Sequence, residues 1–152
     1  MDTISNSPGR DFISVRLASP ADLEIPELDG PFPCLVWDHD GKTSGAQRKS
    51  IAAALIDSDC RYVVCGGANC SEWENIVDLE YVSRHLDASD EALDASHVMT
   101  TSHEGEGVDD VAFFFVFNTN FDDHDFKSYL LLHVGSSDLM ENLESAVRKY
   151  AE

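Results

Sequence analysis

The sequence is poor in basic residues. Its 152 residues include only 10 Lys and Arg against 29 Asp and Glu, which gives a formal net charge of −19. Nucleic acids and anionic membranes are bound through clustered Lys and Arg, so this deficit argues against both as partners. A negative field instead favours a protein partner with a basic surface and speeds the encounter with it.

Long apolar runs are also missing. No stretch approaches the roughly 20 apolar residues of a membrane-spanning helix, and the N-terminal MDTISNSPGRDF has no basic cluster followed by an apolar segment. Four cysteines in a chain without a secretion signal indicate reduced thiols, so we expect a cytoplasmic protein. With 43% apolar residues, the chain is expected to form a single domain over 1–152, with a flexible end at 1–11.

Proline is nearly confined to one segment, because four of the five prolines lie in 20–33, which is therefore predicted to be a connection. Short apolar or alternating runs predict strands at 13–19, 34–38, 61–65, 97–102 and 129–134. Apolar residues at helical spacing predict helices at 43–59, 71–86 and 138–151.

Capping boxes are predicted at the starts of the first two helices, Ser44 with Gln47 and Ser71 with Glu74. The expected buried stripe of the second helix is Trp73, Ile76, Leu79, Val82 and Leu86. That of the third is Leu139, Leu143, Ala146, Val147 and Tyr150.

The segment 108–118 is ambiguous, since its aromatic and β-branched residues favour a strand. Its place between two predicted strands, and the acidic Asp109 and Asp110 at its start, favour a helix, which we choose. Strands and helices then alternate, which predicts an α/β fold. We expect a three-layer α-β-α domain with a mostly parallel sheet of four to five strands, flavodoxin-like or Rossmann-like.

In folds of this class, ligands bind beyond the carboxyl ends of the strands. The residues that follow the four central strands are Asp38, His39, Asp40 and Gly41; Cys65, Gly66, Gly67, Asn69 and Cys70; Thr101, Ser102, His103 and Glu104; and His133, Gly135, Ser136 and Ser137. We call these residues the strand-end rim. Turns that begin helices are polar for capping reasons as well, but the rim is the best candidate for a binding site.

One motif on the rim suggests chemistry. LVWDHDG, an apolar strand ending in D-x-D-G, resembles the first motif of haloacid dehalogenase-like phosphatases. The resemblance implies that Asp38 is a nucleophile, that Asp40 is an acid and that both help to hold Mg²⁺. The sequence departs from the family at Lys42, which intervenes before Thr43. His103 is a further acid–base candidate.

The stretch CRYVVCGGANCSEW carries two thiols, Cys65 and Cys70, at the C-x₄-C spacing, which is neither a thioredoxin-like motif nor a zinc knuckle. A metal site of these thiols with His103 and Glu104 has acceptable ligands. The alternative, which we favour, is a buried apolar Cys65 and a turn residue Cys70. The stretch resembles a small uncharacterised bacterial α/β family, which implies a bacterial protein and no established activity.

These observations favour a protein-binding, regulatory or accessory module over an enzyme, with no cofactor. Two alternatives stay open. One is a metal-dependent hydrolase that uses Asp38 and Asp40, with Mg²⁺ as its metal. The other is a small-ligand sensor at the rim that uses the turn 135–137.

Overall fold

The structure is a computed structural model, and it describes the whole chain except residues 1, 8, 18–23, 87–96, 120–125 and 152. Its strands are β1 (Asp2–Ser7), β2 (Arg10–Leu17), β3 (Phe32–Asp38), β4 (Cys60–Gly67), β5 (Met99–Ser102) and β6 (Ser128–Val134). Its helices are α1 (Gly45–Asp57), α2 (Cys70–Arg84), α4 (Val108–Phe117) and α5 (Met140–Ala151). The predicted α/β fold is confirmed, including the helix chosen for 108–118.

All six strands form one sheet in the order β1-β2-β6-β3-β4-β5. The five strands from β2 to β5 are parallel, and only β1 runs antiparallel, against β2. The N-terminal end that we expected to be flexible therefore contributes an edge strand, and the sheet has six strands rather than four or five. Strand β1 was missed because DTISNS has too few apolar residues to predict a strand. It forms because it pairs with β2 as a hairpin, and this pairing supplies the backbone hydrogen bonds.

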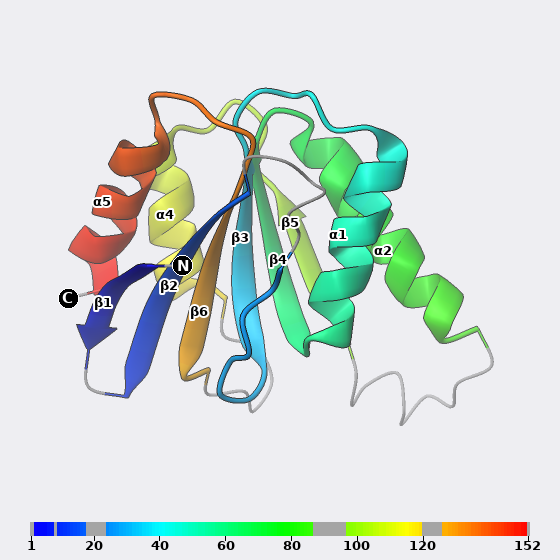
Figure 1. The fold of residues 1–152 in the computed structure, drawn as a ribbon, viewed down its shortest axis with the longest axis horizontal. Coiled ribbons are helices and arrows are strands. Elements are labelled where there is room, and N and C mark those ends of the chain that lie inside the picture. Colours follow the sequence, from blue (N-terminus) through cyan, green and yellow to red (C-terminus); the bar gives the residue numbers. More distant parts are fainter. Residues whose placement is uncertain (1, 8, 18–23, 87–96, 120–125, 152) are drawn as a thin grey trace.

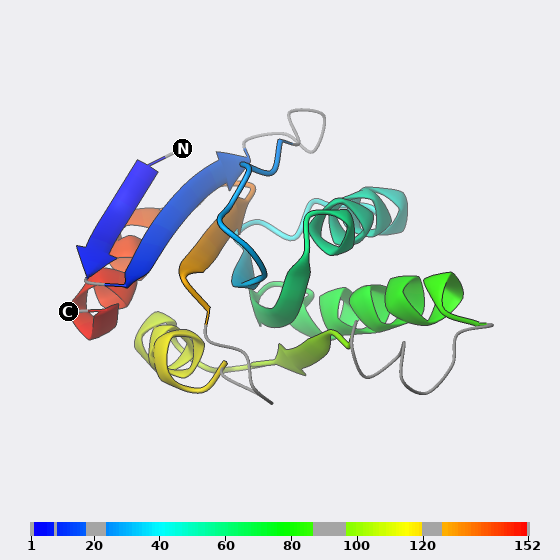
Figure 2. The same cartoon turned by 90° about the horizontal axis from the view of Figure 1, so that it is seen from below.

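The helices cover both faces of the sheet (Figures 1 and 2). Helices α1 and α2 pack on one face, and α4 and α5 pack on the other. Strands β3, β4 and β5 lie side by side in chain order, and β6 then returns to the other side of β3. The order β5-β4-β3-β6 matches the 3-2-1-4 arrangement of dinucleotide-binding folds, whose switch point lies between strands 1 and 4. Here that point lies between β3 and β6.

Alternation along the buried strands builds two cores. In β3, Cys34 and Val36 point toward α1 and α2, whereas Leu35 and Trp37 point toward α4 and α5. Both sets are almost fully buried, as expected for a parallel strand with helices on both faces. The same alternation determines which helix each polar side chain at a strand end can reach.

The helix starts agree only in part with the sequence. The capping box of α1 is confirmed. The Ser44 hydroxyl oxygen accepts from the backbone N–H of Gln47, and the Gln47 side-chain oxygen accepts from the backbone N–H of Ser44. The box predicted for α2 is wrong, because the helix begins at Cys70 after Asn69 in the left-handed conformation (φ 57°), which leaves Ser71 inside the helix.

The predicted buried stripe of α2 is also wrong. The helix buries Trp73, Val77 and Tyr81, while Leu79 and Val82 stay exposed. Both stripes have helical spacing, so periodicity could not distinguish them. In α5, Leu143, Ala146 and Val147 are buried as predicted, whereas Leu139 is 38% exposed.

Within the described ranges, no helix is both long and apolar enough to cross a membrane.

Candidate functional site

The switch point brings together two rim turns that are far apart in the sequence. The backbone N–H of His39 donates to Val134 O at 2.8 Å, and the amide of Ser136 donates to the Asp40 carboxylate at 3.3 Å. Gly135, with φ 75°, lies against that carboxylate, and a Cβ there would collide with it. The β3 and β6 parts of the rim therefore form one compact unit.

A chain of hydrogen bonds runs inward from this surface. His39 Nδ1 lies 2.6 Å from Ser137 Oγ, and His39 Nε2 lies 2.8 Å from His133 Nδ1. His133 Nε2 lies 3.1 Å from a carboxylate oxygen of Glu144 on α5. We call Ser137, His39, His133 and Glu144 the histidine relay.

The protonation of the relay follows from its burial. His133 is fully buried, and burial lowers its pKa to about 4 despite the neighbouring Glu144 carboxylate. Burial also lowers the pKa of the half-buried His39, although Asp38 and Asp40 oppose this change. Both rings are therefore neutral near pH 7, and each carries a single N–H.

The directions of the hydrogen bonds are then fixed. Glu144 can only accept, so the His133 proton is on Nε2 and His133 Nδ1 accepts from His39 Nε2–H. His39 Nδ1 is then an acceptor for the Ser137 hydroxyl. Every proton in the relay points from Ser137 toward Glu144.

Glu144 is anchored by β2. Arg16 Nη2 lies 2.7 Å from one carboxylate oxygen, and the Ser14 hydroxyl donates to the other. Burial raises the pKa of Glu144, but the hydrogen bonds from Arg16 and Ser14 outweigh it, so the net pKa is below its ordinary value. This carboxylate is charged, and it defines the inner end of the relay.

Sequence reasoning placed His39, His133 and Ser137 at the rim but missed Ser14, Arg16 and Glu144. A signal was present, because Glu144 lies between Leu143 and Val147 on the apolar face of its helix. A carboxylate at such a position requires a polar partner. Alternation in β2 points Ser14 and Arg16 to the same face of the sheet as His133.

The two aspartates predicted to be catalytic, at and just after the end of β3, have different surroundings. Asp38 is buried, and its carboxylate accepts from the Trp73 indole N–H at 3.0 Å, the Thr43 hydroxyl at 3.3 Å and the Gly41 amide at 2.9 Å. Asp40 is exposed and accepts from the Lys42 and Ser136 amides. Protein donors reach both oxygens of Asp38, and the two carboxylates brace the turn between β3 and α1.

The glycine pair of the β4 turn is explained by packing. A Cβ on Gly66 would lie 2.7 Å from the Trp37 ring, and Gly67 has φ 77° and passes close to the Asp38 carbonyl. The pair therefore allows the indole to cover the end of β4 and does not by itself indicate a phosphate cradle.

The cysteines are free and buried. Burial raises the pKa values of Cys34 and Cys65 well above normal and that of Cys60 to about 12. Those thiols stay protonated at neutral pH, so they are poor nucleophiles and poor metal ligands. Among the residues that the structure describes, no group of three or more His, Cys, Asp or Glu side chains is placed to hold a metal ion.

The β4–β5 part of the rim forms a separate unit. His103 is buried, and its two ring nitrogens contact Thr101 Oγ1 at 2.9 Å and Glu106 at 2.7 Å. Ser102 ends β5 and pairs with Cys65 in the sheet. Because β3 and β4 separate β5 from β6, His103 does not join His39 and His133. A pocket of about 350 Å³ lies beside this unit, lined by Gly67, Ala68, Asn69, Cys70, Ser71, Glu72 and Glu104.

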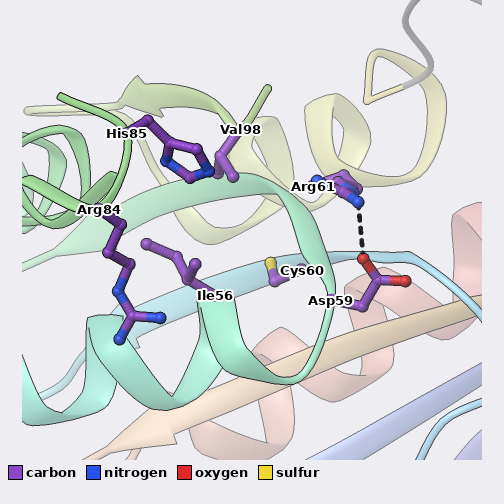
Figure 3. Close-up of a pocket in the computed structure, with 7 residues that line it drawn as sticks. All are labelled: Ile56, Asp59, Cys60, Arg61, Arg84, His85 and Val98. Carbon is purple, nitrogen blue, oxygen red and sulfur yellow. Dashed lines mark ion pairs between the residues drawn. The ribbon is translucent and has the colours of Figure 1, made fainter. Parts of the chain in front are cut away.

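A second pocket, of about 360 Å³, lies away from the rim, at the amino-terminal end of β4 (Figure 3). Its basic groups already have carboxylate partners, because Arg61 pairs with Asp59 at 2.9 Å and Arg84 pairs with Asp57 and Glu80. The pocket therefore offers little unpaired positive charge to an anionic ligand.

Comparison with known proteins adds a family but no activity. The comparison with curated proteins finds no match. The model of one family, described as a domain of unknown function (DUF7684), matches residues 12–150, from within β2 to the last turn of α5. The chain belongs to this family, in agreement with the resemblance to an uncharacterised α/β family.

Proposed function

We propose that the protein is a protein-binding module that docks a basic partner on the outer face of α2. The observation that carries this proposal is an apolar stripe that the fold leaves uncovered. Leu79, Val82 and Leu86 are 63%, 53% and 75% exposed. Leu79 and Val82 recur at i and i+3, so their side chains lie on one side of α2, and Leu86 follows just after the helix ends.

The stripe differs from ordinary exposed apolar residues. Scattered exposed leucines are common and require no explanation. Here the same helix already buries Trp73, Val77 and Tyr81 against the sheet, so the second stripe does not stabilise the described fold. Aligned apolar anchors on one helix face match the way in which helices dock into partner grooves.

The charge of the surroundings supports a basic partner. Exposed Glu72 and Asp78 lie toward the N-terminal end of the stripe, and the whole chain carries a net charge of −19. A partner with an apolar groove or helix bordered by Lys or Arg would match both features. Complementary charge would mainly accelerate association and exclude acidic competitors.

Site-specific photo-cross-linking tests the proposal. A photoreactive residue at Val82 should capture a partner in cells, whereas one at Ser145, exposed on the opposite side of the sheet, should not. The captured protein is then purified, and its association rate is measured with the native chain and with the Leu79→Ser, Val82→Ser variant.

The variant should bind at least about tenfold more weakly, since each lost anchor contributes about 1 kcal/mol or more. The association rate of the native chain should fall steeply as salt is raised toward 0.15 M. Equal capture from positions 82 and 145, a cross-linked product of twice the chain mass, or a salt-independent rate would contradict a basic partner on this face.

A further inference from the structure

The histidine relay ends at a half-exposed hydroxyl, and this geometry suggests an activity separate from docking on α2. We infer that Ser137 is a nucleophile for acyl transfer from ester substrates, with His39 as its general base. In this assignment His133 and Glu144 are positioning residues, because they act through His39.

The contact geometry fits this role. Ser137 Oγ lies 2.6 Å from His39 Nδ1, within the range at which a base takes a hydroxyl proton. His39 is held at its other nitrogen by His133, and His133 is held by Glu144. The relay consists of a hydroxyl, an imidazole, a second imidazole and a carboxylate, in that order. This arrangement corresponds to the nucleophile, base and orienting carboxylate of a catalytic triad, with a second imidazole inserted before the carboxylate.

A capping role alone does not account for the relay. Ser137 Oγ also accepts from the Leu139 amide at 3.1 Å, which needs only an oxygen lone pair. Capping requires neither imidazole. Burying His133 and Glu144 behind His39 carries a desolvation cost that an apolar pair of similar volume would avoid. The relay also lies at the switch point, where this fold class binds its ligands.

The reaction balances within the chain. The Ser137 oxygen forms a bond to the ester carbonyl carbon, and its proton moves to His39 Nδ1. As the ester C–O bond breaks, His39 returns that proton to the leaving alkoxide, which departs as an alcohol. Water, deprotonated by the same nitrogen, then attacks the acyl-serine, so that a carboxylic acid leaves and Ser137 recovers its proton.

Local charge selects the substrate class. The charges of Asp38 and Asp40 act on His39, and the carboxylate of Glu144 ends the relay, with Arg16 already paired to it. Anionic substrates would be repelled, so neutral or cationic esters are the expected class. Ser137 lies just before the start of α5, and the N-terminal end of a helix favours nearby negative charge of the kind that an ester carbonyl oxygen gains in acyl transfer.

A neutral alkyl fluorophosphonate tests the nucleophile directly. The reagent should label the native protein at Ser137, as located by peptide mass spectrometry, with loss of fluoride. His39→Gln preserves a hydrogen-bond acceptor but cannot take the proton, so labelling should slow by about 10²- to 10⁴-fold. Ser145→Ala, on the outer face of α5, is the matched control and should label at the native rate.

A second measurement does not depend on a suitable reagent pocket. In Ser137→Cys, the introduced thiol should react with iodoacetamide at pH 7 at least about tenfold faster than in Ser137→Cys, His39→Gln, because an adjacent base raises the thiolate fraction. Circular dichroism and thermal melting confirm that each variant is folded. Either labelling of Ser137 that survives His39→Gln or equal alkylation rates in the two cysteine variants would overturn the inference.

Discussion

At the β3–β6 part of the rim, the strand ends place His39 and His133 in direct hydrogen-bond contact, and the contact continues inward to Glu144. At the β4–β5 part, the strand ends bury Cys65 among apolar side chains, and the His103 ring hydrogen-bonds to Thr101 and Glu106, which are close to it in the sequence. Both regions have polar or reactive residues after a strand in the sequence. Only at the first does the strand order reverse, because the chain runs from β3 outward to β5 and then returns to β6 on the other side of β3.

The two parts of the rim differ in how far their hydrogen bonds reach through the fold. The relay links the turn after β3 to β6 and α5, and Glu144 connects it to Ser14 and Arg16 of β2, so changing one member affects several elements. The hydrogen bonds of the His103 ring stay within 101–106, so changes there should have smaller and more independent effects. The following measurements rank these effects.

The largest effect is expected at the inner end of the relay. Glu144→Ala leaves Arg16, Ser14 and His133 without their shared acceptor and should lower the free energy of unfolding by about 3 kcal/mol. Urea denaturation measures this loss. Glu141→Ala, exposed on the same helix, should cost no more than about 1 kcal/mol. Equal losses in the two variants would show that the relay has no special energetic role.

Acid should destabilise the protein through the buried imidazoles. The folded pKa of His133 is about 4, below its ordinary value, so on acidification the unfolded chain takes up a proton that the folded chain does not. Stability is therefore retained above pH 6.5 and falls toward pH 4, by about 3 kcal/mol for this group. His39 acts in the same direction, whereas Glu144, whose pKa is also lowered, contributes only at more acidic pH.

Denaturation curves at several pH values check this expectation. His133→Gln should flatten the dependence between pH 6.5 and 4.5, while His97→Gln, exposed just before β5, should not. An unchanged slope in His133→Gln would mean that His133 titrates normally.

In the β4–β5 part, the glycine pair should be sensitive to added volume. Gly66→Ala would force its Cβ against the buried Trp37 ring and should cost about 1–3 kcal/mol. Gly45→Ala, in the open first turn of α1, should instead be neutral or stabilise by up to about 1 kcal/mol. Thermal unfolding of the two variants compares them, and equal shifts would contradict the packing explanation.

A smaller effect is expected for the thiol of this region. If Cys65 is an apolar core residue, Cys65→Ala should cost about 1 kcal/mol, from a small cavity. Cys65→Ser should cost more, because it buries a hydroxyl among apolar neighbours. Chemical denaturation gives both values. The reverse order would indicate a polar role for this thiol.

The smallest effect is expected from Mg²⁺. Because the Asp38 oxygens are occupied by Trp73, Thr43 and Gly41, millimolar Mg²⁺ should leave the melting temperature unchanged. A rise that disappears in both Asp38→Asn and Asp40→Asn would restore the metal-dependent interpretation.

The sequence by itself determined the alternation of strands and helices, because apolar periods of two and of 3.6 residues are local properties of the chain. It also determined the parallel central sheet and the set of rim turns, since β-α-β units place successive carboxyl ends at one edge. The Ser44–Gln47 capping box was equally readable, because both partners lie within one turn of helix.

Only the tertiary structure decided which rim residues act together. Strand order put β6 beside β3, and side-chain alternation directed Ser14, Arg16 and His133 toward Glu144 on α5. It also decided that α2 turns Trp73 to the sheet and Leu79 to solvent. The first outcome depends on contacts between residues far apart in the sequence, such as His39 with His133 and Ser14 with Glu144. The second depends on which of two equally periodic helix faces meets the sheet. Local patterns carry no information about either.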